Sequence, residues 1–173
     1  MMSVGVLTDC SCVLVGGLLG TVLGSRFTPA LREKLTMVLG FASMAIGINS
    51  IVKANQMSPV VIAVIFGTLL GEVLQLEKHI TQLFGKAVHR LPHGEGFEMD
   101  RFITVVVLFC ASGFGIYGVL VEGMSGSPAV LQSKAMLDLC TAAVFAVTLG
   151  VAVAVIALPM LAVMLALFFA AGA

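Results

Sequence analysis

Six long runs of apolar residues divide the chain, with short polar stretches between them. They cover residues 4–23, 35–52, 59–74, 102–120, 135–157 and 159–171. A helix needs about 20 apolar residues to cross the hydrocarbon core of a bilayer. Backbone polar groups must be paired internally in lipid, so each run is expected to be helical. The pattern predicts an all-α fold, a polytopic transmembrane helix bundle with about six spans.

The boundary between the last two runs is the least defined, because only Leu158 separates them. A single kinked helix over residues 135–171 is the alternative. At ~1.5 Å per residue such a helix would extend far beyond a hydrocarbon core of about 30 Å. We therefore favour two spans, the second restarting at Pro159.

The composition supports a membrane location. Hydrophobic residues make up 60% of the chain and charged residues 10%, against roughly 45–50% and about 25% in soluble domains. No polar stretch is long enough to form a second domain. We therefore expect residues 1–173 to form a single membrane domain whose main partner is the lipid bilayer.

Basic residues are distributed unevenly between the connecting segments, which predicts an orientation. The second and fourth connections contain only Lys53 and Lys134. Positive charge favours the cytoplasmic side. The first and third connections, which contain the remaining basic residues, would then lie in the cytoplasm. The N-terminus would lie on the outer side of a bacterial inner membrane. The basic residues of the first and third connections are Arg26, Arg32, Lys34, Lys78, Lys86, Arg90 and Arg101.

The two halves of the chain resemble each other. Residues 28–34 and 127–134 both contain a Ser/Thr-Pro pair followed by a lysine and an apolar run, and each half then restarts at a proline, Pro59 or Pro159. Three spans per half would make the second half enter the membrane from the opposite side. Such inverted repeats build many transporters. The alternative is a chance match between two apolar helices.

These repeats would cover residues 4–74 and 102–173. The segment between them, 75–101, is the only long polar stretch, and its apolar residues recur at helical spacing up to residue 87. This spacing predicts a short amphipathic helix at the cytoplasmic surface. A solvated helical linker between the halves is an equally good interpretation.

Polar residues inside the apolar runs are the candidate functional residues. Such groups are expensive in lipid and usually face the bundle interior. Lys134 and Asp138 are four residues apart, so they share one helix face and can pair. The carboxylates suit a cation or a relayed proton; alternatively, Glu72, Asp138 and Asp9 are half-solvated near span ends. The full set is Asp9, Asn49, Glu72, Ser112, Lys134 and Asp138.

Glycines recur at four-residue spacing in two of the runs. Small residues allow helices to approach closely in membranes. We interpret them as packing positions, within the chain or between copies in a homo-oligomer, with a narrow backbone-lined path as the alternative. The candidates at this spacing are Gly16, Gly20, Gly24, Gly67 and Gly71, and Gly113 is added because the fourth run is also rich in glycine.

Several other classes of function have no support in the sequence. His89 and His93 have the spacing of a zinc pair, but Pro92 interrupts any helix between them and no third ligand follows. We therefore expect no metal and no cofactor. Phosphate loops, nucleophile motifs and basic stripes for nucleic acid are absent from the sequence. The sequence predicts neither an enzyme nor a nucleic-acid-binding protein.

Three motifs in the second half of the chain point to a known family: VLFCASG at 107–113, EGMSGSP at 122–128 and KAMLD at 134–138. With Gly71-Glu72 and Leu149-Gly150, they resemble the YqgA/YdfK-type family of bacterial inner-membrane proteins, a family of unknown function. The resemblance extends over essentially the whole chain. It implies a multi-pass membrane protein and no particular activity.

Together these features predict a transporter or channel for a small ion or solute. Glu72, Lys134 and Asp138 would form its polar core, with Asn49 and Ser112 lining the path. The alternative is a non-transporting membrane scaffold that assembles through its glycine faces. In that case the Lys134–Asp138 pair would only fix the helix register.

Overall fold

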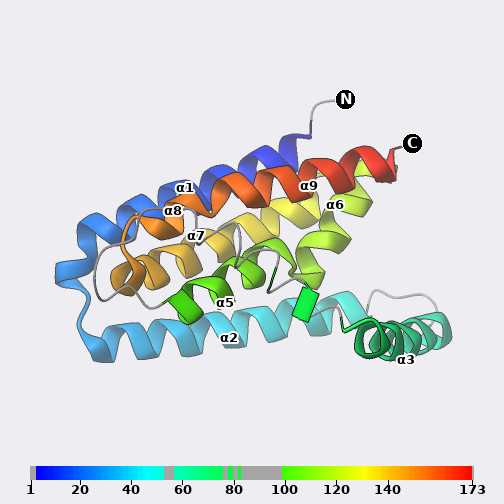
Figure 1. Cartoon of the computed structure of the whole chain (residues 1–173), viewed down its shortest axis with the longest axis horizontal. Coiled ribbons are helices and arrows are strands. Elements are labelled where there is room, and N and C mark those ends of the chain that lie inside the picture. The colour runs from blue at the N-terminus through cyan, green and yellow to red at the C-terminus, as the bar shows by residue number, and fades with distance from the viewer. Residues whose placement is uncertain (1–2, 53–56, 76–77, 80–81, 83–98, 173) are drawn as a thin grey trace.

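The computed structural model describes residues 3–52, 57–75, 78–79, 82 and 99–172 of the chain. All regular secondary structure in this part is helical (Figure 1). The helices are α1 (Val4–Leu23), η1 (Gly24–Arg26), α2 (Pro29–Val52), α3 (Met57–Val73), α5 (Met99–Cys110), α6 (Gly113–Ser125), α7 (Ala129–Leu149), α8 (Ala152–Val155) and α9 (Ala157–Ala171).

The described helices confirm the predicted all-α membrane bundle. Five helical segments are long and apolar enough to cross a membrane, namely Val4–Leu23, Pro29–Val52, Arg101–Ser125, Ala129–Leu149 and Ala152–Ala171. A sixth apolar segment, Val60–Val73 within α3, is shorter. Most of the predicted amphipathic segment 75–101 lies outside the described residues. His89 and His93 also lie outside them.

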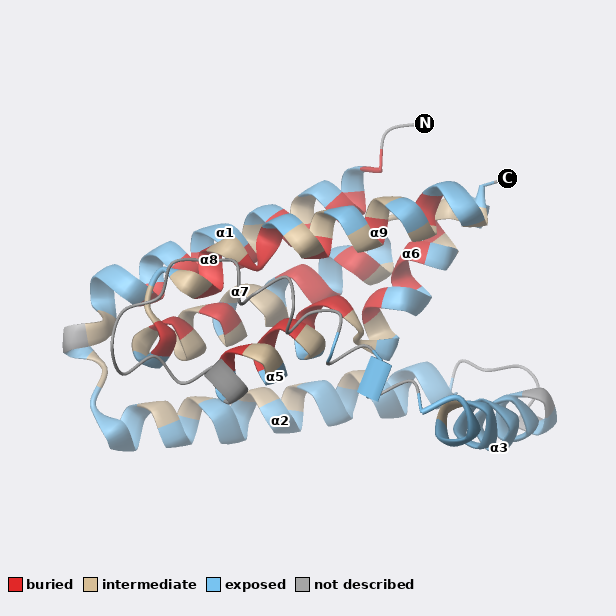
Figure 2. Cartoon of the chain, in the orientation of Figure 1, coloured by how far each residue is buried: buried red, intermediate tan, exposed pale blue. Residues whose placement is uncertain are grey.

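The core of the bundle lies between α1, α5, α6, α7 and α9 (Figure 2). The α1–α7 pair has the most extensive contact in the described structure. Figure 1 shows that both helices run away from the end where the two chain termini lie, whereas α2, α5, α6 and α9 run towards it. We call this end of the bundle the termini end.

Two glycines allow α1 to lie directly against α7. A Cβ atom at Gly16 would collide with the carbonyl oxygen of Leu139, and one at Gly20 with that of Ala143. Backbone carbonyls of a helix cannot move aside as a flexible side chain can. Close approach through small residues is the usual basis of helix association in lipid. Gly24, which follows, makes only ordinary van der Waals contact with Val147.

The predicted boundary between the last two spans is wrong. The fifth span begins at Ala129 and ends at Leu149, and Ala152–Ala171 forms the last span. Gly150 ends α7 because its φ of 63° and ψ of −149° are accessible to few residues other than glycine. Pro159 does not mark the break, since it is the third residue of α9. A proline in the first turn removes only an N–H that has no intrahelical partner.

The fourth span is also different from the prediction. It extends to Ser125 and consists of two helices, α5 and α6, which are interrupted at Ala111 and Ser112. The apolar run 102–120 gave no indication of a break, because Ala111 and Ser112 are both compatible with a helix interior in lipid. This interruption lies next to α7 and contributes to the site described below.

The helices α2 and α3 lie outside this core. No residue of α2 is buried, and α2 packs mainly on α7. Every residue of α3 whose burial is described is exposed or, at Gly71, intermediate. Figure 2 shows both helices as almost continuously exposed, with α3 projecting from the rest of the bundle.

Candidate functional site

Three charged side chains from α1 and α7 meet inside the bundle. The Lys134 ammonium donates a hydrogen bond to Asp9 Oδ2 at 2.9 Å and another to Asp138 Oδ2. The exposed fractions of Lys134, Asp9 and Asp138 are 2%, 0% and 14%. We call these residues the Asp–Lys–Asp cluster. The sequence predicted the Lys134–Asp138 pair but did not predict that Asp9 joins it from 125 residues away.

The cluster carries one more negative than positive charge when all three groups are ionised. Since both aspartates bond to the same nitrogen, their bonded oxygens lie within ~6 Å of each other. Asp9 Oδ1 is buried and has no hydrogen-bond partner among the described residues. Two carboxylates this close repel each other, and the Lys134 ammonium that both contact reduces the repulsion.

The position of Asp138 within its span differs from the prediction. The sequence placed it near the outer end of a span beginning at residue 135, whereas it is the tenth of the 21 residues of α7. Lys134 also lies within the span and is not part of a connecting loop. Both residues are therefore inside the membrane-crossing segment, with Asp138 close to its middle.

The interruption between α5 and α6 lies at a similar depth. Ser112 is the twelfth residue of the 25-residue segment Arg101–Ser125. It has extended backbone angles, and its hydroxyl oxygen accepts a hydrogen bond from the N–H of Gly115 at 3.3 Å, so it caps α6. The ends of two helices meet here, and helix ends carry backbone groups without intrahelical partners. Broken helices in membranes are tolerated where they line a cavity or are buried in protein.

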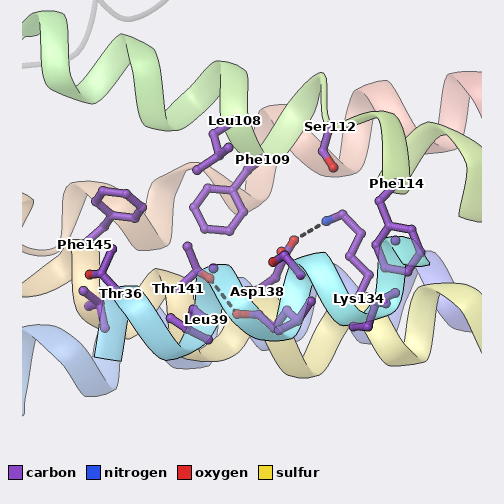
Figure 3. Close-up of a pocket in the computed structure, with 16 residues that line it drawn as sticks. Thr36, Leu39, Leu108, Phe109, Ser112, Phe114, Lys134, Asp138, Thr141 and Phe145 are labelled. Carbon is purple, nitrogen blue, oxygen red and sulfur yellow. Dashed lines mark hydrogen bonds and ion pairs between the residues drawn. The ribbon is translucent and has the colours of Figure 1, made fainter. Parts of the chain in front are cut away.

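A cavity of about 440 Å³ connects these two features. It lies between α2, the α5–α6 interruption and α7 (Figure 3). We call it the mid-span cavity. Figure 3 shows side chains from all three elements converging on it, with the Lys134–Asp138 ion pair at one side. Its polar side chains are Thr36, Ser43, Ser112, Lys134, Asp138 and Thr141.

The other predicted polar residues lie elsewhere. Asn49 is exposed and lines a second cavity of about 730 Å³, together with Tyr117 and Ser133. Glu72 is an exposed residue of α3, a helix that has no extensive contact with α7. The structure therefore does not bring Glu72 together with Lys134 and Asp138. The hydropathy pattern located Glu72 in a span but could not show which way its helix faces.

The glycines separate into two groups. Gly16 and Gly20 contact α7 closely, as described above. A Cβ atom added at Gly67, Gly71 or Gly113 would meet no heavy atom within 4 Å among the described residues. Within the described chain these three glycines therefore do not act as packing positions.

Glu122 is a buried acidic residue that the sequence analysis did not select. It lies on α6 in the same stripe as Gly115 and Gly118, with an exposed fraction of 4%. The apolar run ended at residue 120, which placed Glu122 in the connection that follows. Its spacing from the two glycines, seven and four residues, was the signal that could have placed it on a packed helix face.

Among the described residues, no group of three or more His, Cys, Asp or Glu side chains is arranged to hold a metal ion. The Asp–Lys–Asp cluster instead contains its own cation, the Lys134 ammonium. Its three charged groups are joined by ion pairs.

Comparison with protein families gives a clear result. The model of the family described as "Protein of unknown function (DUF554)" matches residues 4–173. The chain belongs to this family. The resemblance inferred from the three motifs is confirmed.

Two uncharacterised proteins are similar to most of the chain. The chain is 40% identical to the "Uncharacterized protein YqgA" of Escherichia coli (strain K12) over 177 residues, covering 99% of this chain and 75% of the relative. It is 27% identical to the "Uncharacterized membrane protein YdfK" of Bacillus subtilis (strain 168) over 158 residues, covering 89% of this chain and 66% of the relative. No solved structure matches the chain significantly.

Proposed function

We propose that this protein is a transporter or channel for a small ion or solute, with the mid-span cavity as its binding site. The observation that carries the proposal is the buried Asp–Lys–Asp cluster at the side of a cavity beside an interrupted helix. Charged groups within membrane spans are rare because they are costly, and they commonly mark ion or substrate paths. A bundle that served only as a scaffold would not need a cavity next to them.

The interrupted helix adds support. In many transporters, substrates and coupling ions bind near the bilayer midplane, where discontinuous helices expose backbone N–H and C=O groups. Ser112, at the interruption, and Asp138 both line the cavity at the middle of their spans. The excess negative charge of the cluster favours a cation over an anion as the transported or coupled ion.

The arrangement is also consistent with inverted repeats. The helices α2 and α7 follow the two Ser/Thr-Pro pairs, and Figure 1 shows them running in opposite directions. The mid-span cavity lies between them and the interrupted span. We propose that residues 4–74 and 102–173 are the two repeats and that the cavity lies at their interface.

We further propose that the protein lies in the bacterial inner membrane with its N-terminus outside. The basic residues support this orientation, since Lys134 is buried within α7 and leaves Lys53 as the sole basic residue of the second and fourth connections. The termini end of the bundle would then face outwards.

Ion flux across a reconstituted membrane tests the proposal. Proteoliposomes on a solid-supported membrane are exposed to concentration jumps of Na⁺, K⁺ or H⁺, and the transient current is recorded. We expect a saturable current that Asp138→Asn abolishes. The matched control is Glu72→Gln, which removes an exposed carboxylate outside the cavity and should keep the current. Absence of current with the wild-type protein, or full current with Asp138→Asn, would contradict the proposal.

A membrane scaffold that forms homo-oligomers is a second candidate. The open surface of α3, with Gly67 and Gly71 facing no described neighbour, favours it. Gly20 is not suited to test it, because that residue already packs against α7 within one chain. Gly67→Leu should reduce the oligomer measured by light scattering in detergent. An unchanged oligomer would count against the scaffold.

A further inference from the structure

The Lys134 ammonium is shared between two carboxylates whose surroundings differ. Asp138 is partly exposed and lines the mid-span cavity (Figure 3), whereas Asp9 on α1 is completely buried. The described residues of the cavity lining come from α2, α7 and the interrupted span, and none of them lies on α1. Asp138 is therefore the carboxylate of the cluster that a molecule in the cavity can reach.

The Lys134 ammonium can give up its bond to Asp138 and stay paired. An ammonium has three N–H donors, and this one bonds to one oxygen of each aspartate. Asp9 Oδ1 is buried and has no hydrogen-bond partner among the described residues. It can therefore accept the N–H that Lys134 withdraws from Asp138, so that both oxygens of Asp9 bind the ammonium.

The stem of the Lys134 side chain has room for this small movement. It passes Gly115 of α6, where a Cβ atom would lie 2.9 Å from Lys134 Cε. The terminal methyl group of Met164 lies beside the same glycine. Methionine side chains adapt readily to a changed neighbour, and the four-carbon stem of lysine is flexible. The ammonium can therefore shift towards Asp9 without a movement of the helices.

The charges of the cluster leave a place for one monovalent cation. With all three groups ionised, the two carboxylates and one ammonium carry one excess negative charge. A second monovalent cation would give each aspartate its own partner, whereas a divalent ion would leave an excess positive charge. Uncompensated charge inside a protein is costly. The balance therefore favours a ligand with a single positive charge.

The mid-span cavity suits an organic ammonium better than a bare metal ion. Its volume of about 440 Å³ lies within the range of ~300–1,000 Å³ that is typical of small-molecule pockets. Hard metal ions collect several oxygen ligands, whereas Asp138 is the one carboxylate among the described lining residues. An ammonium on a short apolar chain would place its N–H groups on Asp138 and its carbon atoms against apolar side chains. These include Leu39, Leu108, Phe109 and Phe145.

We propose that a primary organic ammonium ion binds Asp138 in the mid-span cavity in place of the Lys134 ammonium, and that Asp9 holds Lys134 while the ligand is bound. Lys134 is then a built-in competitor that occupies Asp138 when the cavity is empty. Asp9 strengthens ligand binding without touching the ligand. This inference rests on the proposed function, because it names the ligand class of that binding site.

Thermal unfolding of the protein in lipid nanodiscs tests ligand binding without requiring transport. Chloride salts of n-propylammonium, Na⁺ and K⁺ are titrated separately, so that ionic strength is matched at each concentration. We expect a saturable rise in the unfolding temperature with propylammonium and none with 1-propanol, which has the same carbon chain without the charge. Asp138→Asn should remove this rise, and the control Glu72→Gln should keep it.

Two variants test the exchange of Lys134 between the aspartates. Asp9→Asn leaves Asp138 as the sole carboxylate partner of Lys134. It should raise the half-maximal propylammonium concentration about tenfold or more, as expected for the loss of one charged hydrogen bond. Asp9→Asn combined with Lys134→Gln restores the wild-type net charge of the cluster and removes the competitor. This double variant should bind propylammonium more tightly than the wild-type protein.

The exchange is wrong if the double variant binds no more tightly than the wild-type protein. If the double variant does not fold, Asp9→Asn alone decides, because an unchanged half-maximal concentration would overturn the exchange. Wild-type protein that propylammonium does not stabilise would overturn the whole inference.

The results also separate this inference from the transport proposal. Stabilisation by Na⁺ or K⁺ that Asp138→Asn removes, with none by propylammonium, would overturn the organic ligand and keep the transport proposal. Propylammonium binding with the expected effects of the variants, but no current with propylammonium or any inorganic cation, would keep the exchange and overturn transport.

Discussion

The helices α1 and α2 are equally apolar, yet the structure uses them differently. The most apolar 18-residue stretch has a mean hydropathy of 1.9 in α1 and 1.8 in α2. One face of α1 is buried against α7 and contains Asp9, whereas no residue of α2 is buried. In lipid, an apolar side chain gains little by leaving the acyl chains for a protein interior. Close backbone approach and polar pairing therefore distinguish the packed helix from the peripheral one, and hydropathy does not.

The largest expected effect comes from removing the shared cation of the cluster. Lys134→Met would leave Asp9 and Asp138 without their partner, and breaking a buried ion pair costs ~3–5 kcal/mol. Unfolding by SDS in mixed micelles, followed by circular dichroism, measures the loss. The control Lys34→Met removes an exposed lysine of α2 and should change stability by less than ~0.5 kcal/mol. If the two variants lost the same stability, the buried α1–α7 interface and the exposed α2 would not differ in the way proposed here.

Neutralising the whole cluster sharpens this prediction. Asp9→Asn and Asp138→Asn combined with Lys134→Met leave no uncompensated charge. Replacing a buried ion pair or triad as a unit is often close to neutral. We expect the triple variant to recover most of the stability that Lys134→Met loses, in the same SDS titration. A triple variant as unstable as the single one would show that side-chain size, not charge, sets the cost.

The next effect concerns the glycine contacts. Gly20→Leu places a side chain against the backbone of Ala143 in α7, and overpacking of this kind costs ~1–3 kcal/mol. Gly67→Leu is the same substitution on α3, where no described atom lies within 4 Å, and should be nearly neutral. Thermal unfolding in detergent compares the two. A larger loss for Gly67→Leu would mean that α3 has a packing partner outside the described chain.

A smaller effect is expected at the helix interruption. Ser112→Ala removes the side-chain cap of α6, which typically costs ~1 kcal/mol. The control Ser133→Ala removes an exposed hydroxyl that donates a hydrogen bond to the carbonyl of Ala129 in its own helix, α7. It should have little effect. If SDS unfolding shows the same stability for both variants, the Ser112 hydroxyl does not stabilise the helix interruption.

The smallest effect is expected for Glu72→Gln. Glu72 is exposed on α3, and exposed substitutions usually change stability by less than ~0.5 kcal/mol. Thermal unfolding should give the same midpoint as the wild-type protein. A clear destabilisation would place Glu72 in a buried polar contact and return it to the polar core that the sequence predicted.

The sequence identified the helical spans well and their relations poorly. Apolar runs locate helices because lipid requires the backbone to be paired within each span. Apolar runs do not show where a helix is interrupted or ends. The interruption between α5 and α6 depends on the Ser112 cap, and the end of α7 depends on the positive φ of Gly150. Prolines were misleading, because Pro159 sits in a first turn that tolerates it.

Within the site, local pairing was predictable and long-range pairing was not. Lys134 and Asp138 follow from i,i+4 spacing. Asp9 joins them only because Gly16 and Gly20 bring α1 against α7, and nothing in the sequence says which helix those glycines contact. Glu72 and Asn49 were selected for the same reason as Asp9, namely a polar group in an apolar run, but their helices remain at the periphery.

A double-mutant cycle between Asp9→Asn and Lys134→Met tests the central claim most directly, namely that these residues pair across α1 and α7. The stabilities of the wild-type protein, both single variants and the double variant are measured in the same SDS titration. Because the residues are in direct contact, we predict a coupling free energy of ~1–3 kcal/mol. Single effects that simply add, to within ~0.5 kcal/mol, would contradict the pairing and the site built on it.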